Sequence, residues 1–204
     1  MQFLSLVRSL SIDTPDVEER PCPDQYVGNS QNLDLNGSTS LRRPATDRPD
    51  EPSLLVVLES PHVEEFKSDP APAMGSTGRL ISKHLKEVAG LGPDEDRPVL
   101  LINAIQHQCS LGRRPTCFRD RVFAAVWAGG GREDFVSRLS VLMRPGDVIL
   151  CCCTKGGTAQ PSQQLRQLVY NAIVESFPLA RVLRRTHPAS WHSRTNRRYE
   201  WTAA

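Results

Sequence analysis

Short polar clusters that follow apolar runs are where this chain could carry out chemistry. The clearest begins at Glu59, directly after the apolar run 54–58, and continues through Ser60 and Pro61 to His62. Three further clusters follow apolar runs: Asn103 with Gln106 and His107, residues 154–157, and residues 187–190. Carboxylate, imidazole and amide groups are the ones that proteins use to transfer protons and to bind polar substrates. One such cluster alone is typical of a solvated loop, so its meaning depends on whether the fold brings several of them together.

The apolar runs must position these clusters, and from about residue 53 they alternate with helical patterns. Strands are predicted at 54–59, 98–105, 147–153 and 180–188. Helices are predicted at 79–90, 118–128, 133–143 and 163–177. This alternation predicts an α/β fold with three layers, α/β/α, around a central four-stranded parallel sheet. Because the carboxyl ends of parallel strands meet at one edge of the sheet, the four polar clusters are expected to converge there.

Residues 1–52 differ from the rest because they are rich in proline and charge and contain no repeat. They are predicted to form an irregular N-terminal arm or leader, and residues 53–204 to form the α/β/α domain. Within the arm, the stretch 1–10 has the spacing of a short helix that packs its apolar residues on the domain. Those residues are Phe3, Leu4, Val7 and Leu10.

The overall composition is typical of a globular protein. The chain has 204 residues, of which 39% are apolar and 24% charged, with a net charge of +2. No apolar span approaches the roughly 20 residues that a membrane helix needs. The start of the chain also lacks the basic leader of a signal peptide. We therefore expect no membrane partner, a cytoplasmic location and a monomer.

The cysteines do not form a recognisable ligand set. Cys151, Cys152 and Cys153 are consecutive, which suits a buried strand end, and no C-x-x-C pair occurs. His107, Cys109 and Cys117 could act as ligands, but a fourth at suitable spacing is missing. The sequence therefore predicts no metal and no cofactor.

Four stretches, taken in order, resemble the uracil-DNA glycosylase superfamily. "LESPHVEE" followed by "MGSTGRLISKHL" is similar to the bacterial pattern Gly-Glu-x-Pro-Gly-x-x-Glu and then Pro-Phe-x-Gly-x-x-Gly-x-Leu-Leu. The matching positions are Glu59, Pro61, Glu65 (or Glu64), Gly75, Gly78, Leu80 and Ile81. "LLINAIQHQ" resembles the strand with the base-reading Asn, "VILCCCTKGG" the third strand and its glycine turn, and "HPASWHSR" the closing His-Pro-Ser motif. The resemblance extends over residues 54–194.

The resemblance implies a DNA glycosylase that hydrolyses the N-glycosidic bond of a flipped uracil or another damaged or modified base. Glu59 would be the catalytic carboxylate that positions water or stabilises the oxocarbenium-like sugar. His187, preferably neutral, would be the catalytic donor to the carbonyl oxygen of the departing base. The residues expected to bind the substrate are Pro61, His62, Met74, Gly75, Asn103 and Ser190.

DNA is the expected partner, and the C-terminal region is the expected surface. From residue 181 onward the chain carries six arginines against the single acid Glu200, with aromatic residues interleaved. Trp191 is predicted to be the wedge that replaces the flipped base. The predicted DNA contacts are Lys155, Trp191, Arg194 and Arg197. A solvated C-terminal face, with Trp191 buried beneath the tail, remains the alternative interpretation.

Three departures from the family pattern keep other functions open. Met74 takes the place of the aromatic residue that stacks on uracil, His62 replaces a glycine, and the cysteines of the iron–sulfur branch are absent. The base could therefore differ from uracil, or catalysis could be altered. The alternatives are a nucleic-acid or nucleotide-binding module without turnover and an N-glycosidic hydrolase that acts on a free nucleoside or nucleotide.

Overall fold

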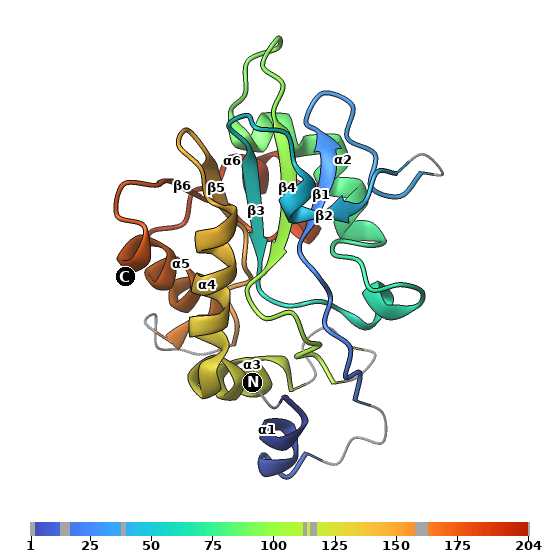
Figure 1. Cartoon of the computed structure of the whole chain (residues 1–204), viewed down its shortest axis with the longest axis vertical. Helices are drawn as coiled ribbons and strands as arrows, with labels where there is room; N and C mark the ends of the chain where they lie inside the picture. Colours follow the sequence, from blue (N-terminus) through green and yellow to red (C-terminus); the bar gives the residue numbers. More distant parts are fainter. Residues whose placement is uncertain are drawn as a thin grey trace.

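The computed structural model describes residues 3–12, 17–37, 40–111, 114, 118–157 and 163–203. At its centre lies a six-stranded sheet in the order β2-β1-β4-β3-β5-β6 (Figure 1). The strands are β1 (Gln25–Asn29), β2 (Arg43–Pro44), β3 (Leu54–Leu58), β4 (Pro98–Asn103), β5 (Val148–Cys151) and β6 (Arg181–Arg184). The predicted α/β class is confirmed, but the predicted strand number is wrong because the sheet has six strands and not four.

The four strands that the sequence predicted form the parallel part of the sheet. β3 pairs in parallel with both β4 and β5, and β5 pairs in parallel with β6. Every residue of β3, β4 and β5 is buried. Strands covered on both faces have continuous apolar sequences, which explains why these runs were visible without any alternation.

The two additional strands come from the segment that was predicted to be irregular. β1 pairs antiparallel with β4 on one side and with β2 on the other. The β1 sequence "QYVGN" has little apolar character, and its register against β4 shifts between Tyr26 and Asn29. Its pairing with β4 makes it a strand, so its own residue pattern did not reveal it.

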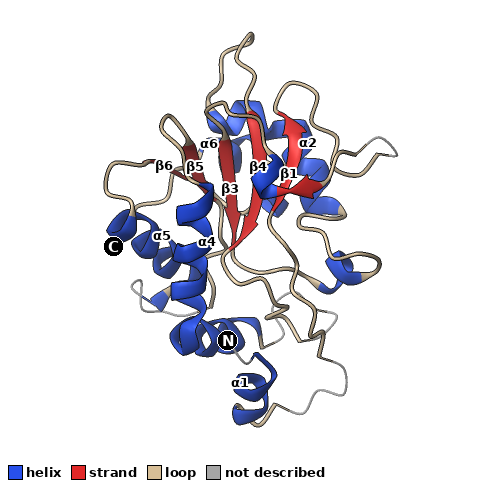
Figure 2. Ribbon diagram, in the orientation of Figure 1, coloured by secondary structure: helices blue, strands red, loops and turns tan. Residues whose placement is uncertain are grey.

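Helices cover both faces of the sheet (Figure 2). On the face defined by Leu54, Val56 and Leu58, here called the α2 face, lies α2 (Ser76–Ala89). The face defined by Leu55 and Val57, here called the α5 face, packs against the remaining long helices. These are α1 (Phe3–Ser9), α3 (Arg119–Val126), α4 (Arg132–Leu142) and α5 (Leu165–Ser176). None of the helices in the described part of the chain has the length and apolar character needed to cross a membrane.

Shorter helical turns complete the connections. They are η1 (Ala45–Asp47), η2 (Val63–Phe66), η3 (Trp127–Gly131), η5 (Pro188–Ser190) and α6 (Arg194–Arg198). α2 ends at Gly90, as the sequence predicted, because this glycine takes the left-handed conformation and its N–H caps the last turn.

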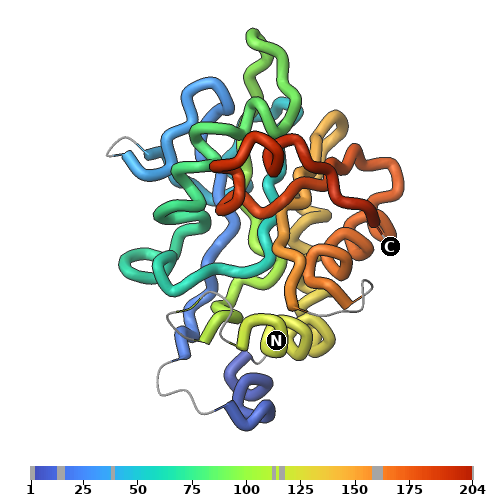
Figure 3. Tube along the Cα trace, turned by 180° about the vertical axis from the view of Figure 1, so that it is seen from behind, coloured from blue at the N-terminus to red at the C-terminus, as the bar shows by residue number. Residues whose placement is uncertain are grey.

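The C-terminal tail beyond β6 crosses from one face of the sheet to the other. Figure 3 shows it in red, running across the back of the molecule beside α2. Trp191 packs within the core of the α2 face, whereas Trp201 packs within that of the α5 face, and both are fully buried. The tail is therefore part of the core on both faces of the sheet.

Candidate functional site

The sheet has a topological switch point between β3 and β5. These strands are parallel neighbours, but the chain leaves β3 toward α2 on one face and leaves β5 toward α5 on the other. Connections that diverge in this way open a crevice at the carboxyl ends of the strands, where open α/β sheets bind their ligands. Glu59 follows β3 and Thr154 follows β5 at this point, so the strand order itself selects the candidate site.

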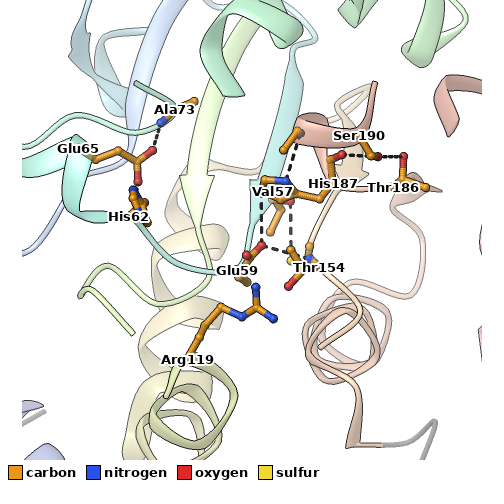
Figure 4. A network of polar contacts seen from close by, with 12 residues as sticks. Val57, Glu59, His62, Glu65, Ala73, Arg119, Thr154, Thr186, His187 and Ser190 are labelled. Carbon is orange, nitrogen blue, oxygen red and sulfur yellow. Dashed lines mark hydrogen bonds and ion pairs between the residues drawn. The ribbon is translucent and has the colours of Figure 1, made fainter. Parts of the chain in front are cut away.

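Glu59 is a buried carboxylate with few partners. Its Oε2 accepts a hydrogen bond from the backbone N–H of Thr154 at 3.1 Å, which links the ends of β3 and β5 (Figure 4). An ionised carboxylate offers about four acceptor positions. The side chain is therefore held at the switch point and keeps acceptor capacity for a substrate or a water molecule.

His187 faces Glu59 across the site. Its Nε2 lies 3.8 Å from Glu59 Oε2, which is too far for a hydrogen bond. Its Nδ1 accepts from the backbone N–H of Ala189 at 3.2 Å, so in the neutral imidazole the proton sits on Nε2. This arrangement follows from the sequence His187-Pro188, in which the histidine caps the short helix η5 that the proline begins. An N–H donor and a carboxylate acceptor thus face one another without being bonded to each other.

Arg119, which the sequence analysis missed, completes the group. It is the first residue of α3, and its guanidinium points toward Glu59 and Thr154 (Figure 4). Its Nε donates to Asp120 Oδ1 at 2.8 Å, and Asp120 Oδ2 accepts from the N–H of Gly157 in the loop after β5. No motif marked this arginine, because it reaches the strand ends from a helix that follows the β4 loop.

Several buried polar atoms near the strand ends have no partner among the described residues. They are Thr154 Oγ1, Asn103 Oδ1 and His62 Nε2. Buried polar atoms are nearly always hydrogen-bonded, so each of these has capacity that a ligand or an ordered water molecule would satisfy. Of the three, Thr154 adjoins Glu59 directly.

Asn103 ends β4, opposite Leu58 in the parallel register. Its Nδ2 lies 3.7 Å from the Sγ of Cys22, and the N–H of Cys22 donates to Gln106 O. The N-terminal segment therefore covers Asn103, which is buried. The predicted role in reading a base would require the Cys22 segment to move aside.

The loop that follows Glu59 is folded around a second carboxylate, Glu65. This carboxylate accepts from the backbone N–H groups of His62, at 2.7 Å, and Ala73 (Figure 4). Burial raises the pKa of Glu65 to about 7, and the nearby negative charge of Glu59 adds to this, while the backbone hydrogen bonds oppose it. Arg42 lies close enough to interact with Glu65 electrostatically. Glu65, and not the exposed Glu64, is thus the carboxylate that organises this loop.

Four predicted substrate-binding residues belong to this loop and not to the Glu59–His187 pair. Pro61 is buried, and His62 caps η2 by accepting from the N–H of Glu64. Met74 is half-buried, and the exposed Gly75 exchanges hydrogen bonds with Asn36 of the N-terminal segment. In Figure 4 the group of His62, Glu65 and Ala73 lies apart from Glu59 and His187.

The raised pKa of Glu65 predicts a pH dependence that a variant can isolate. Its folded-state pKa of about 7 exceeds the ordinary value of 4.5, so the protonated group contributes stability below pH 4.5 that is lost as the pH rises through 7. The free energy of unfolding should fall over this range by up to about 3 kcal/mol relative to Glu65→Gln. Urea denaturation at about pH 5, 6, 7 and 8 measures this difference. Glu64→Gln, at an exposed site, should not remove the loss, and parallel pH profiles for all three proteins would contradict the prediction.

Gly78 allows α2 to begin against this loop. A Cβ at this position would lie 2.1 Å from the carbonyl oxygen of Ala73. Gly78→Ala should therefore destabilise the fold by about 1–3 kcal/mol, as overpacked sites do. Gly92→Ala is the matched control, because its nearest atom would be 3.9 Å away. Equal melting temperatures for the two variants would contradict this prediction and show that the loop at Ala73 moves aside for the added methyl group without loss of stability.

Two further residues that were predicted to contact substrate or DNA, Ser190 and Lys155, lie beyond the ends of β6 and β5. The hydroxyl of Ser190 lies 3.0 Å from Thr186 Oγ1 and 2.8 Å from His187 O, so it stabilises the turn that carries His187. Lys155 is exposed on the loop after β5. Ser190 is thus a support for the site, and Lys155 remains accessible to a partner.

The predicted wedge is contradicted, and the predicted basic surface is largely paired. Trp191 is fully buried and donates from Nε1 to Thr186 O at 2.9 Å, so it is a core residue that offers no surface to DNA.

Most arginines of the predicted basic surface have acidic partners. Arg197 donates to Glu87 and to the carbonyl of Trp191. Arg194 is exposed and has no acidic partner among the described residues. Two further arginines of this region, 184 and 185, pair with Glu200.

The cysteine and histidine side chains do not gather into a ligand set in the part of the chain that is described. Cys22, Cys109 and Cys151–Cys153 are buried free thiols. Cys117, the third of the ligands considered from the sequence, lies outside the described residues.

Comparison with known proteins identifies no relative of the chain. No protein-family model, no curated protein and no solved structure matches the chain.

Proposed function

We propose that this protein hydrolyses an N-glycosidic bond and that its substrate is a base in DNA. The observation that supports this most directly is the pair formed by Glu59 and His187 at the switch point of the sheet. The carboxylate and the Nε2–H group face each other at 3.8 Å and remain unbonded to each other. A substrate that binds over the pair meets an acceptor and a donor side by side.

The reaction needs these two groups. Cleavage of the bond builds positive charge on the sugar and negative charge on the departing base. Glu59 stabilises the positive sugar or takes a proton from the attacking water, as carboxylates do in glycoside hydrolysis. His187 donates a hydrogen bond from Nε2 to the carbonyl oxygen of the base, where negative charge develops. The hydrogen bond from Ala189 N–H to Nδ1 supports this role, since it places the donor proton on Nε2.

The unpaired polar atoms give the substrate further partners. Thr154 Oγ1 is buried beside Glu59 and has no partner among the described residues. A hydroxyl can both donate and accept, which suits a sugar hydroxyl, a ring oxygen or a base edge. The order of the four motifs along the chain supports a base as the leaving group, because it resembles the glycosylase pattern.

A free nucleoside or nucleotide is the second candidate substrate, and the C-terminal tail favours it. The buried Trp191 and the paired arginines at 184, 185 and 197 reduce the surface that this tail offers to a DNA strand. A small substrate would need only the groups at the strand ends.

The test uses labelled oligonucleotides, single- and double-stranded, that carry uracil, hypoxanthine, xanthine or a modified pyrimidine. Alkali converts each abasic site into a strand break, and chromatography detects bases released from free nucleosides and nucleotides in parallel. Glu59→Gln serves as the inactive control. Strand breaks that are absent with the control support DNA base excision, and release from free nucleosides alone supports the second candidate. Release of no base from any substrate would contradict the proposal.

A further inference from the structure

Phe118 is an exposed aromatic residue at the start of α3. Its side chain is 43% exposed, and no aromatic ring or cation of the described residues packs on it. Its φ angle is +55°, in the left-handed region that bulky residues rarely occupy. The backbone is held there because the Phe118 carbonyl accepts from the N–H of Val122 at 3.0 Å, in the first turn of the helix. The fold thus presents this ring to solvent in a strained conformation, an arrangement that is commonest at functional sites.

Arg119, the next residue, presents a cation to the strand ends. Its side chain is 11% exposed and is directed toward Glu59 and Thr154 (Figure 4). Only its Nε is bonded, to Asp120, so neither terminal nitrogen has a hydrogen-bond partner among the described residues. A guanidinium with both terminal nitrogens available matches the oxygens of a phosphate in two-pronged geometry.

Asp120 fixes this pair relative to the site. One of its oxygens accepts from Arg119 Nε and the other from the N–H of Gly157, in the loop after β5. The first turn of α3 is therefore tied to the same loop whose first residue, Thr154, donates to Glu59. Phe118, Arg119 and the catalytic pair are held as one group.

We propose that Phe118 and Arg119 bind the nucleotide next to the target nucleotide in a single strand. The Phe118 ring stacks on the neighbouring base, and the Arg119 guanidinium pairs with the phosphate between the two nucleotides. Adjacent residues lie about 3.8 Å apart at their Cα atoms, so one residue pair can contact a base and the phosphate beside it. Stacking on an aromatic ring tolerates any base, whereas the phosphate gives a charge-dependent contact. The inference rests on the proposed function and locates the strand at α3, away from the C-terminal tail.

The test measures binding, so that it does not depend on turnover. Fluorescence anisotropy follows a short labelled single strand titrated with Glu59→Gln protein at several salt concentrations. Adding Phe118→Ala should weaken binding about tenfold or more. Adding Arg119→Ala should weaken binding and reduce the slope of log affinity against log salt by about 0.7, the value for one phosphate of a single strand. Arg119→Lys keeps the charge and should keep most of that slope.

Matched controls separate this surface from others and from loss of folding. Phe118→Gly accepts the positive φ without strain, so it should melt no lower than the parent and yet bind as weakly as Phe118→Ala. Tyr199→Ala removes a ring that is 50% exposed in the C-terminal tail, and Arg198→Ala removes an arginine there whose side chain is 64% exposed. Both should bind the strand as the parent does.

The outcomes distinguish failure of this inference from failure of the proposed function. Weaker binding by the α3 variants supports the inference even if no base is released. The inference is overturned if the α3 variants bind like the parent, if only the C-terminal variants weaken binding, or if no single strand binds. Loss of single-strand binding through Arg119 alone, with no effect of Phe118, also overturns it, because the neighbouring base would then make no contact with the ring.

Discussion

Glu59→Gln should lower the rate of base release by at least about 100-fold while the protein stays folded. The amide has nearly the shape of the carboxylate, and its oxygen can still accept the hydrogen bond from Thr154 N–H that spans 3.1 Å in the native protein. What the variant loses is the negative charge, which the positive sugar or the attacking water needs. Single-turnover measurement of base release, together with a melting curve, separates the two effects.

The control for this variant lies five residues further along the chain. Glu64→Gln removes the charge of an exposed carboxylate whose ionic partner is Lys67, and its rate should match that of the native protein. His187→Ala should also lose rate, and the double variant with Glu59→Gln should be little slower than the worse single variant, because residues that act as a unit are not additive. A Glu59→Gln protein with native activity would reduce Glu59 to a structural acceptor for Thr154 N–H.

Arg48→Ala should destabilise the fold by about 3 kcal/mol or more. Arg48 Nη1 lies 3.0 Å from Asp147 Oδ1, and the two side chains are only 1% and 0% exposed. The same carboxylate accepts from the backbone N–H groups of Ser53 and Arg144. Removing the guanidinium leaves a buried charge without its counter-ion, and this position joins the N-terminal segment to the starts of β3 and β5. Denaturation with urea or guanidinium chloride measures the loss.

The Arg144–Asp50 pair provides the comparison. Its atoms are 3.1 Å apart, but the Asp50 side chain is 98% exposed. Exposed pairs contribute little, so Asp50→Asn should cost less than about 1 kcal/mol. If Arg48→Ala cost no more than this control, water would have to reach Asp147 in the variant.

The sequence was sufficient for the parallel strands and for the two residues that face each other at their ends. β3, β4 and β5 are buried on both faces, so they appear as continuous apolar runs. Glu59 directly follows β3 and His187 lies three residues beyond the end of β6, and the rule that such ends converge placed them together. β1 was missed because its pairing with β4, and not its own composition, makes it a strand.

The rest of the site depends on contacts that spacing does not encode. Arg119 reaches Glu59 from a helix on the α5 face, more than fifty residues away in the sequence. Trp191 was predicted to be a surface wedge because it lies beyond His187 among arginines and other aromatic residues, whereas it packs on the α2 face and Arg197 pairs with Glu87. Residue types alone do not say which side of a short tail turns inward.

The position of the two tail tryptophans has a consequence for how the chain is made. Trp191 fills one core layer, and Trp201 packs edge-on against Tyr170 of α5 at 5.5 Å in the other. On the ribosome, neither layer can close until these residues have left the exit tunnel. The apolar surfaces of α2 and α5 therefore stay open until residues 191–201 have emerged, and until then a nascent chain of this protein is exposed to aggregation.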